Sequence, residues 1–182
     1  MSFSNYIKKM RGTTKGSPPR VSNSEIFWSW VGAFLGIAAC GVLTQFYFSG
    51  HDLTMIIGSF GASAVLAYGA VRSPLAQPRN LIGGHVVSAI IGVATFKLLH
   101  QYPWAADAVA VATAIAVMHA TRTLHPPGGA TALIAVIGSE KIHAIGFYYV
   151  LIPATLGPLI LLAVALLVNN IPSTRRYPEV WF

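Results

Sequence analysis

The sequence predicts an all-α membrane protein with six membrane segments, arranged as two inverted three-segment repeats in which the second segment of each half is short and broken. Three observations support this fold class. Apolar residues make up 54% of the 182 residues and charged residues only 9%, several apolar runs are long enough to cross a bilayer, and one short stretch of sequence recurs. A soluble domain of this size could not bury so much apolar surface.

Four of the apolar runs are long enough for a hydrocarbon core about 30 Å thick, which takes about 20 helical residues. They are Ile26–Phe48, Asn80–Leu99, Trp104–Thr121 and Gly146–Val168. Two further apolar stretches, Leu53–Val71 and His125–Ile137, are short and contain Gly or Pro. An alternative with four spans leaves the apolar composition of these two stretches without a reason, so six segments are preferred.

The placement of the basic residues predicts the orientation. The net charge is +7, and the basic side chains gather in the polar segments, which is typical of the positive-inside rule and not of nucleic-acid binding. We expect a basic cytoplasmic tail at 1–24, a transmembrane domain at 25–170 and a cytoplasmic tail at 171–182, with membrane lipid as the surroundings. The first 25 residues lack the apolar region of a cleavable signal peptide.

The internal repeat divides the membrane domain. Gly61–Ala67 reads GASAVLA, and 68 residues later Gly129–Ala135 reads GATALIA. The halves are therefore about 24–100 and 101–170. Because each half would cross the membrane an odd number of times, the second half is inverted relative to the first. Inverted repeats with short, interrupted segments place a substrate site near the bilayer midplane.

The two short segments are predicted to be half-helices with their N-termini near that midplane. Pro126 and Pro127 favour a helix start there, and the repeat offset puts the other start near Ser59–Gly61, after an entering stretch at Thr54–Ile57. A helix N-terminus has free N–H groups and partial positive charge, so the two ends together would hold an anion. The sequence thus predicts transport of a small inorganic anion.

The candidate residues lie in or beside these helix starts. Arg122 is the sharpest one, because a buried Arg needs a partner and few acids are available, although an inner-loop Arg that sets topology is the alternative. The candidates for substrate binding are Arg122, His125, Pro126, Pro127, Gly128, Gly129, Thr131, Ser59, Gly61 and Ser63. The candidates for the pathway are His85, His119, Arg79 and Asn80.

Other functions have weaker support. His85, His119 and His125 could suggest a zinc site, but their spacing is unlike known metal motifs, so no metal and no cofactor is expected. No carboxylate pair or Ser/His/Asp arrangement predicts an enzyme. Lys97 and Asp107 are expected to form an ion pair at the outer interface. A non-transporting scaffold or sensor subunit stays open, as does a homo-oligomer.

The stretch from Thr121 to Leu133, TRTLHPPGGATAL, resembles the signature of the HPP family of integral membrane proteins. Ser73–Asn80 followed by Gly83-Gly84-His85 is similar to a second block of that family. Members from cyanobacteria and chloroplasts are associated with nitrite transport, so the resemblance implies nitrite as substrate and a bacterial inner (plasma) membrane or chloroplast-type envelope as location. The family is often described with four spans, from which the six-segment prediction departs.

Overall fold

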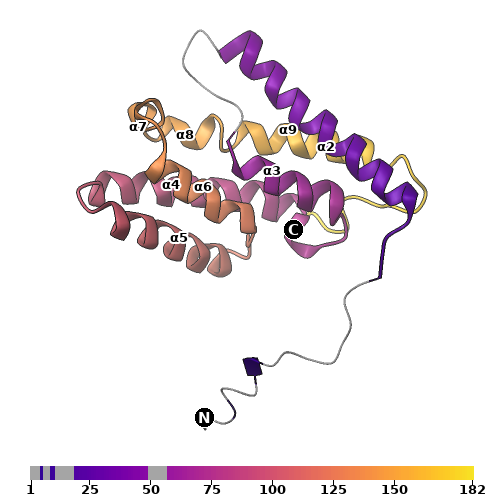
Figure 1. Ribbon diagram of the computed structural model, residues 1–182, viewed down its shortest axis with the longest axis horizontal. Helices are drawn as coiled ribbons and strands as arrows, with labels where there is room; N and C mark the ends of the chain where they lie inside the picture. The colour runs from indigo at the N-terminus through magenta and orange to yellow at the C-terminus, as the bar shows by residue number, and fades with distance from the viewer. Residues whose placement is uncertain (1–4, 6–8, 11–18, 49–56) are drawn as a thin grey trace.

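The computed structural model describes residues 5, 9–10, 19–48 and 57–182, and these residues form helices and turns without a strand (Figure 1). The entering stretch predicted at Thr54–Ile57 lies, except for Ile57, outside the described residues. The helices are α2 (Asn23–Leu43), α3 (Ser59–Ala64), α4 (Pro78–Leu99), α5 (Pro103–Ala120), α6 (Pro126–Ile137), α7 (Glu140–Ile145), α8 (Tyr148–Leu151) and α9 (Leu156–Val168). Short π-helical turns extend α2 and α3 as η1 (Thr44–Phe48) and η3 (Val65–Gly69), and a 3₁₀ turn, η4 (Pro74–Ala76), precedes α4.

The all-helical prediction is confirmed, and so are four stretches long and apolar enough to cross a membrane. In the described part of the chain these are Asn23–Phe46, Pro78–Leu99, Pro103–Ala120 and Tyr148–Val168. The sequence suggested one continuous run for the last of them. In the structure it is interrupted, because α8 ends at Leu151 and α9 begins at Leu156. Pro153 lies in this gap, where it supplies no N–H group and disfavours helical geometry in the residue before it.

Proline sets the beginning of three helices. Pro78, Pro103 and Pro126 each occupy the first position of α4, α5 and α6, where the missing N–H group has no intrahelical partner to lose. α2 begins differently, with the Ser22 hydroxyl accepting a hydrogen bond from the backbone N–H of Glu25 at 3.2 Å.

Helices α4, α5 and α6 pack together, and α2, α3 and α9 lie beside them (Figure 1). Close packing of α4 on α6 depends on glycine. A Cβ at Gly92 would lie 2.5 Å from the carbonyl oxygen of Ala132, and a Cβ at Gly128 would lie 2.8 Å from that of Gly84. These positions let the two backbones approach as small residues do in membrane helix pairs.

The contacts also give the directions of α3 and α6. Near the start of α6, His125 lies against Gly84 and Ser63, and further along it Thr131 contacts Ser59. Helices α3 and α6 are therefore antiparallel. The first turns of these two short helices overlap, and they run in opposite directions.

The segment after α9 packs against the helices, although the sequence suggested only a tail at 171–182. The side chain of Arg175 is 3% exposed and pairs with Glu25 at 2.8 Å. The Tyr177 hydroxyl donates to the carbonyl oxygen of Ala76 at 2.7 Å, and burial raises the pKa of Tyr177. Arg175 is therefore a structural ion-pair residue as well as a basic residue near a helix end.

Candidate functional site

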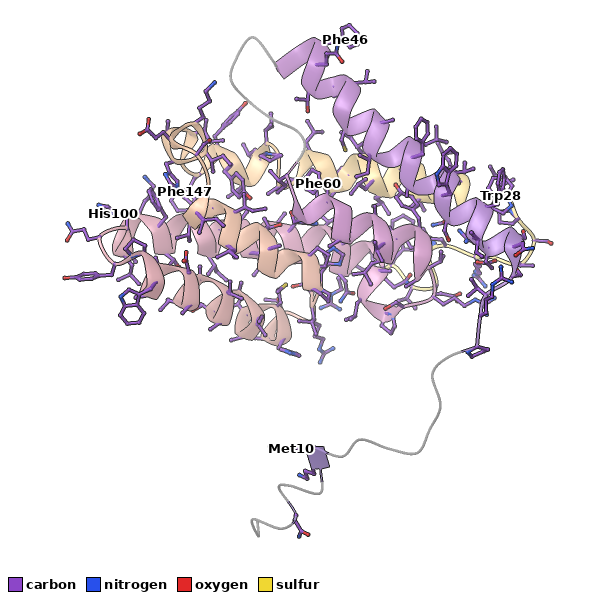
Figure 2. The ribbon with its side chains drawn as sticks, viewed as in Figure 1. Met10, Trp28, Phe46, Phe60, His100 and Phe147 are labelled. Carbon is purple, nitrogen blue, oxygen red and sulfur yellow. The ribbon has the colours of Figure 1, made fainter. Side chains whose placement is uncertain are left out.

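A buried polar cluster lies where α3, α4 and α6 meet. Each of its side chains is at most 1% exposed, in a protein that is mostly apolar, and its members are Ser59, Ser63, His85, His125 and Thr131. Phe60, labelled near the centre of Figure 2, packs edge-on against His85 with ring centroids 5.4 Å apart. All five cluster residues are among the predicted site residues, four for binding and His85 for the pathway.

The cluster is one continuous chain of hydrogen bonds. The Ser63 hydroxyl lies 2.7 Å from Nε2 of His85 and 2.9 Å from Nε2 of His125. The other ring nitrogen of His85 lies 2.7 Å from the Thr131 hydroxyl. Nδ1 of His125 lies 2.8 Å from the carbonyl oxygen of Leu75.

The Leu75 carbonyl fixes the direction of the chain when both rings are neutral. A carbonyl oxygen only accepts, so His125 must carry its hydrogen on Nδ1, and its Nε2 accepts from Ser63. Because the Ser63 hydroxyl has one hydrogen, Nε2 of His85 must donate to Ser63. Nδ1 of His85 then accepts from the Thr131 hydroxyl. The two neutral histidines are therefore opposite tautomers.

The repeat is visible in this geometry. Ser63 and Thr131 are separated by the same 68 residues as the two copies of the repeat, and their hydroxyls contact the two nitrogens of the His85 ring. Each half of the chain thus contributes one hydroxyl to a single imidazole. The Thr131 hydroxyl also lies 2.9 Å from that of Ser59.

The glycines and prolines of the HPP stretch have several roles. Pro127 and Gly128 are buried, and a Cβ at Gly128 would lie 2.7 Å from the Ser88 hydroxyl. Gly128 therefore serves the packing of α6 on α4. Pro126 is exposed and Gly129 is half-buried. Gly61 is exposed, and a Cβ there would meet open space.

The remaining candidates lie outside the cluster, toward the end of α5. Arg122 is exposed in the turn after α5, with a φ of 57° in the left-handed region. Arg79 donates to the carbonyl oxygen of Thr121 at 2.9 Å, and Asn80 donates to that of Leu124 at 2.8 Å. These two side chains hold the α5–α6 connection against α4, and Arg122 does not reach the histidines.

The expected ion pair between Lys97 and Asp107 is wrong for the described residues, and His119 lies apart from the cluster. His119 is exposed on α5 and does not join His85 and His125, and the described part of the chain holds no group of three His, Cys, Asp or Glu placed to bind a metal ion. Lys97 and Asp107 do not form an ion pair. Instead Oδ1 of Asp107 is buried without a hydrogen-bond partner among the described residues, and Lys97 lies against Gly146.

Sequence reasoning missed two partners of the cluster. The carbonyl oxygen of Leu75 sets the His125 tautomer, and the Tyr149 hydroxyl donates to the carbonyl oxygen of Thr131 at 3.1 Å. Leu75 belongs to the second HPP-like block, so the sequence did indicate the segment in which it lies. No sequence pattern, however, identifies a backbone carbonyl as a hydrogen-bond partner. Nothing in the sequence marks Tyr149.

Comparison with known proteins places most of the chain in one family. The family described as "HPP, transmembrane region" matches residues 18–178. Two transmembrane proteins of Dictyostelium discoideum are similar along nearly the whole chain, one 45% identical over 99% of it and the other 43% identical over 97%. The chain spans 58% and 63% of the length of these two relatives. No solved structure matches.

Proposed function

This chain belongs to the HPP family of membrane proteins, and on that premise we propose that it transports a small inorganic anion, with nitrite as the first substrate to test. One observation carries the proposal. Five polar side chains with at most 1% exposure meet inside an apolar helical protein, and they come from both halves of the chain. Polar and ionisable groups at membrane depth are costly and usually line a substrate or ion pathway.

The proposal includes the inverted repeat. α6 has 12 residues, which gives about 18 Å at 1.5 Å per residue and is too short for a core of about 30 Å. α3 and η3 together cover only Ser59–Gly69. In this arrangement both short helices begin inside the membrane, run toward opposite faces, and overlap at the cluster.

In this account the hydroxyl and imidazole groups replace water around the anion. The N-terminus of α6 contributes less than the sequence suggested, because Pro126 and Pro127 have no N–H group and the N–H of Gly128 donates to the carbonyl oxygen of His125 at 2.7 Å. Arg79 and Arg122, which flank the end of α5, act at longer range by attracting anions to the cytoplasmic opening.

A scaffold or sensor role is the second candidate, and a specific observation favours it. The side chains of the cluster are enclosed and bonded to one another, as they would be if they only held helices together. A transporter must open this cluster to each side in turn, whereas a scaffold need never open it.

Nitrite flux into liposomes distinguishes the two functions. Wild type is compared with Ser63→Ala, and Ser88→Ala is the matched control. Ser88 is also a buried hydroxyl on α4, but among the described residues its hydrogen bond goes to the sulfur of Met118, at 3.6 Å. We expect about a fivefold lower flux for Ser63→Ala and little change for Ser88→Ala, since a hydrogen bond contributes about 1 kcal/mol and 1.4 kcal/mol is tenfold. Absence of wild-type flux above empty liposomes at neutral pH, where little membrane-permeant nitrous acid exists, would favour the scaffold.

A further inference from the structure

We propose that each anion crosses together with one proton, which binds to the His85–His125 pair, so that a monovalent anion moves without net charge. This inference rests on the proposed function and extends it to the coupling ion. It follows from the charges around the cluster, from its hydrogen-bond pattern and from the distance between the two rings.

Among the residues that the structure describes, none places a fixed positive charge beside the cluster. Arg79 reaches the carbonyl of Thr121 at the end of α5, Arg122 is exposed, and Arg175 is paired with Glu25. An anion at low dielectric is strongly disfavoured unless it is paired with a cation. The two imidazoles are the groups of the cluster that can take up a proton and become cations.

The hydrogen-bond pattern leads to the same requirement. With both rings neutral, Nδ1–H of His125 donates to Leu75, Ser63 donates to His125, His85 donates to Ser63, and Thr131 donates to His85. An anion only accepts hydrogen bonds, and each of these four donors already has an acceptor, which leaves the Ser59 hydroxyl as the one cluster donor outside this chain. The neutral cluster is therefore a poor anion site.

Adding a proton creates donors at the same time as charge. A proton on Nε2 of His125 replaces the hydrogen from Ser63, whose hydroxyl can then donate to an anion. A proton on Nδ1 of His85 releases the hydroxyl of Thr131 in the same way. Without an anion, the released Thr131 hydroxyl can donate to the Ser59 oxygen, which lies 2.9 Å away. Anion binding and proton binding thus favour each other.

One proton per anion is the expected ratio. The ring centroids of His85 and His125 are 5.1 Å apart, so two imidazolium ions would repel each other. The groups that face the pair are the hydroxyls of Ser59 and Ser63, the ring of Phe60, the Thr131 hydroxyl and the Leu75 carbonyl, with Tyr149 one bond further away. Carboxylate, Lys and Arg side chains are absent from these contacts, within the residues that the structure describes.

The test is the dependence of initial nitrite flux on membrane potential and pH. Purified protein in liposomes is compared with empty liposomes, while a potassium gradient with valinomycin sets the potential and an internal dye reports pH. We expect protein-dependent flux to be the same at zero and at 100 mV negative inside, to rise as external pH falls, and to acidify the interior. Uncoupled anion movement would instead be opposed by about 2.3 kcal/mol per 100 mV, roughly a 50-fold difference in final accumulation.

Flux that depends on potential and brings no acid inside would overturn proton coupling and leave anion transport standing. Absence of any flux would overturn both. The double variant His85→Gln/His125→Gln adds a second test, because glutamine can hydrogen-bond but cannot hold the proton. The correctly folded variant should lose the acceleration at low pH, and an unchanged pH profile would contradict the assignment. The wild-type measurement decides the question even if the variant does not fold.

Discussion

Two buried polar networks in this protein differ in the kind of groups that they use. The network around Arg175 is built on an ion pair with Glu25 at 2.8 Å. Arg175 also donates to the carbonyl oxygen of Tyr68 and to the amide oxygen of Asn169, both at 3.2 Å. The central cluster contains only hydroxyls and imidazoles. The charged network is fully paired near the helix ends and fixes the architecture. In the proposed mechanism the central cluster gains and loses a proton, and this is where exchange with a substrate is expected.

The largest predicted effect is a loss of stability when the charged network is broken. Arg175→Ala should lower the free energy of unfolding by about 3–5 kcal/mol, because it leaves a partly buried Glu25 carboxylate without its partner. Thermal unfolding in detergent measures this effect. Arg176→Ala is the control, since Arg176 is exposed. Flux per folded molecule should stay near the wild-type value, and a selective loss of flux in a folded Arg175→Ala protein would contradict the division between the two networks.

A smaller effect is expected from the packing that assembles the central cluster. Gly92→Ala would place a Cβ 2.5 Å from the carbonyl oxygen of Ala132, so α4 and α6 must separate. Overpacking of this kind costs about 1–3 kcal/mol. Gly61→Ala is the matched control, because its Cβ meets open space. Thermal unfolding should separate the two variants, and equal stability would show that α4 and α6 pack less tightly than described.

The smallest predicted effect concerns Arg122. Arg122→Gln should reduce nitrite flux by less than about threefold, because the side chain is exposed and acts through a screened field. The difference from wild type should shrink further as salt is raised. A loss of flux as large as that of Ser63→Ala would indicate that Arg122 binds the anion directly. It would contradict the assignment of Arg122 to the opening of the pathway and of binding to the cluster.

The sequence predicted the fold class and the membrane runs because apolar composition and length are properties of single segments. It also identified all five members of the cluster, through the repeat and the residues beside its copies. It could not show that Arg122 is exposed and separate from the cluster, since proximity to His125 along the chain says nothing about the direction that a left-handed turn gives the side chain. It missed Tyr149 and the carbonyl of Leu75, because contacts between distant segments depend on packing that no local pattern records.

Nitrogen NMR of His85 and His125 in bilayers, with the other four histidines replaced by glutamine, tests the central claim most directly. At alkaline pH without anion we expect His85 to carry its hydrogen on Nε2 and His125 on Nδ1. Saturating nitrite at the same pH should convert one ring of the pair to imidazolium. Signals that stay unchanged with nitrite would contradict anion binding at the cluster.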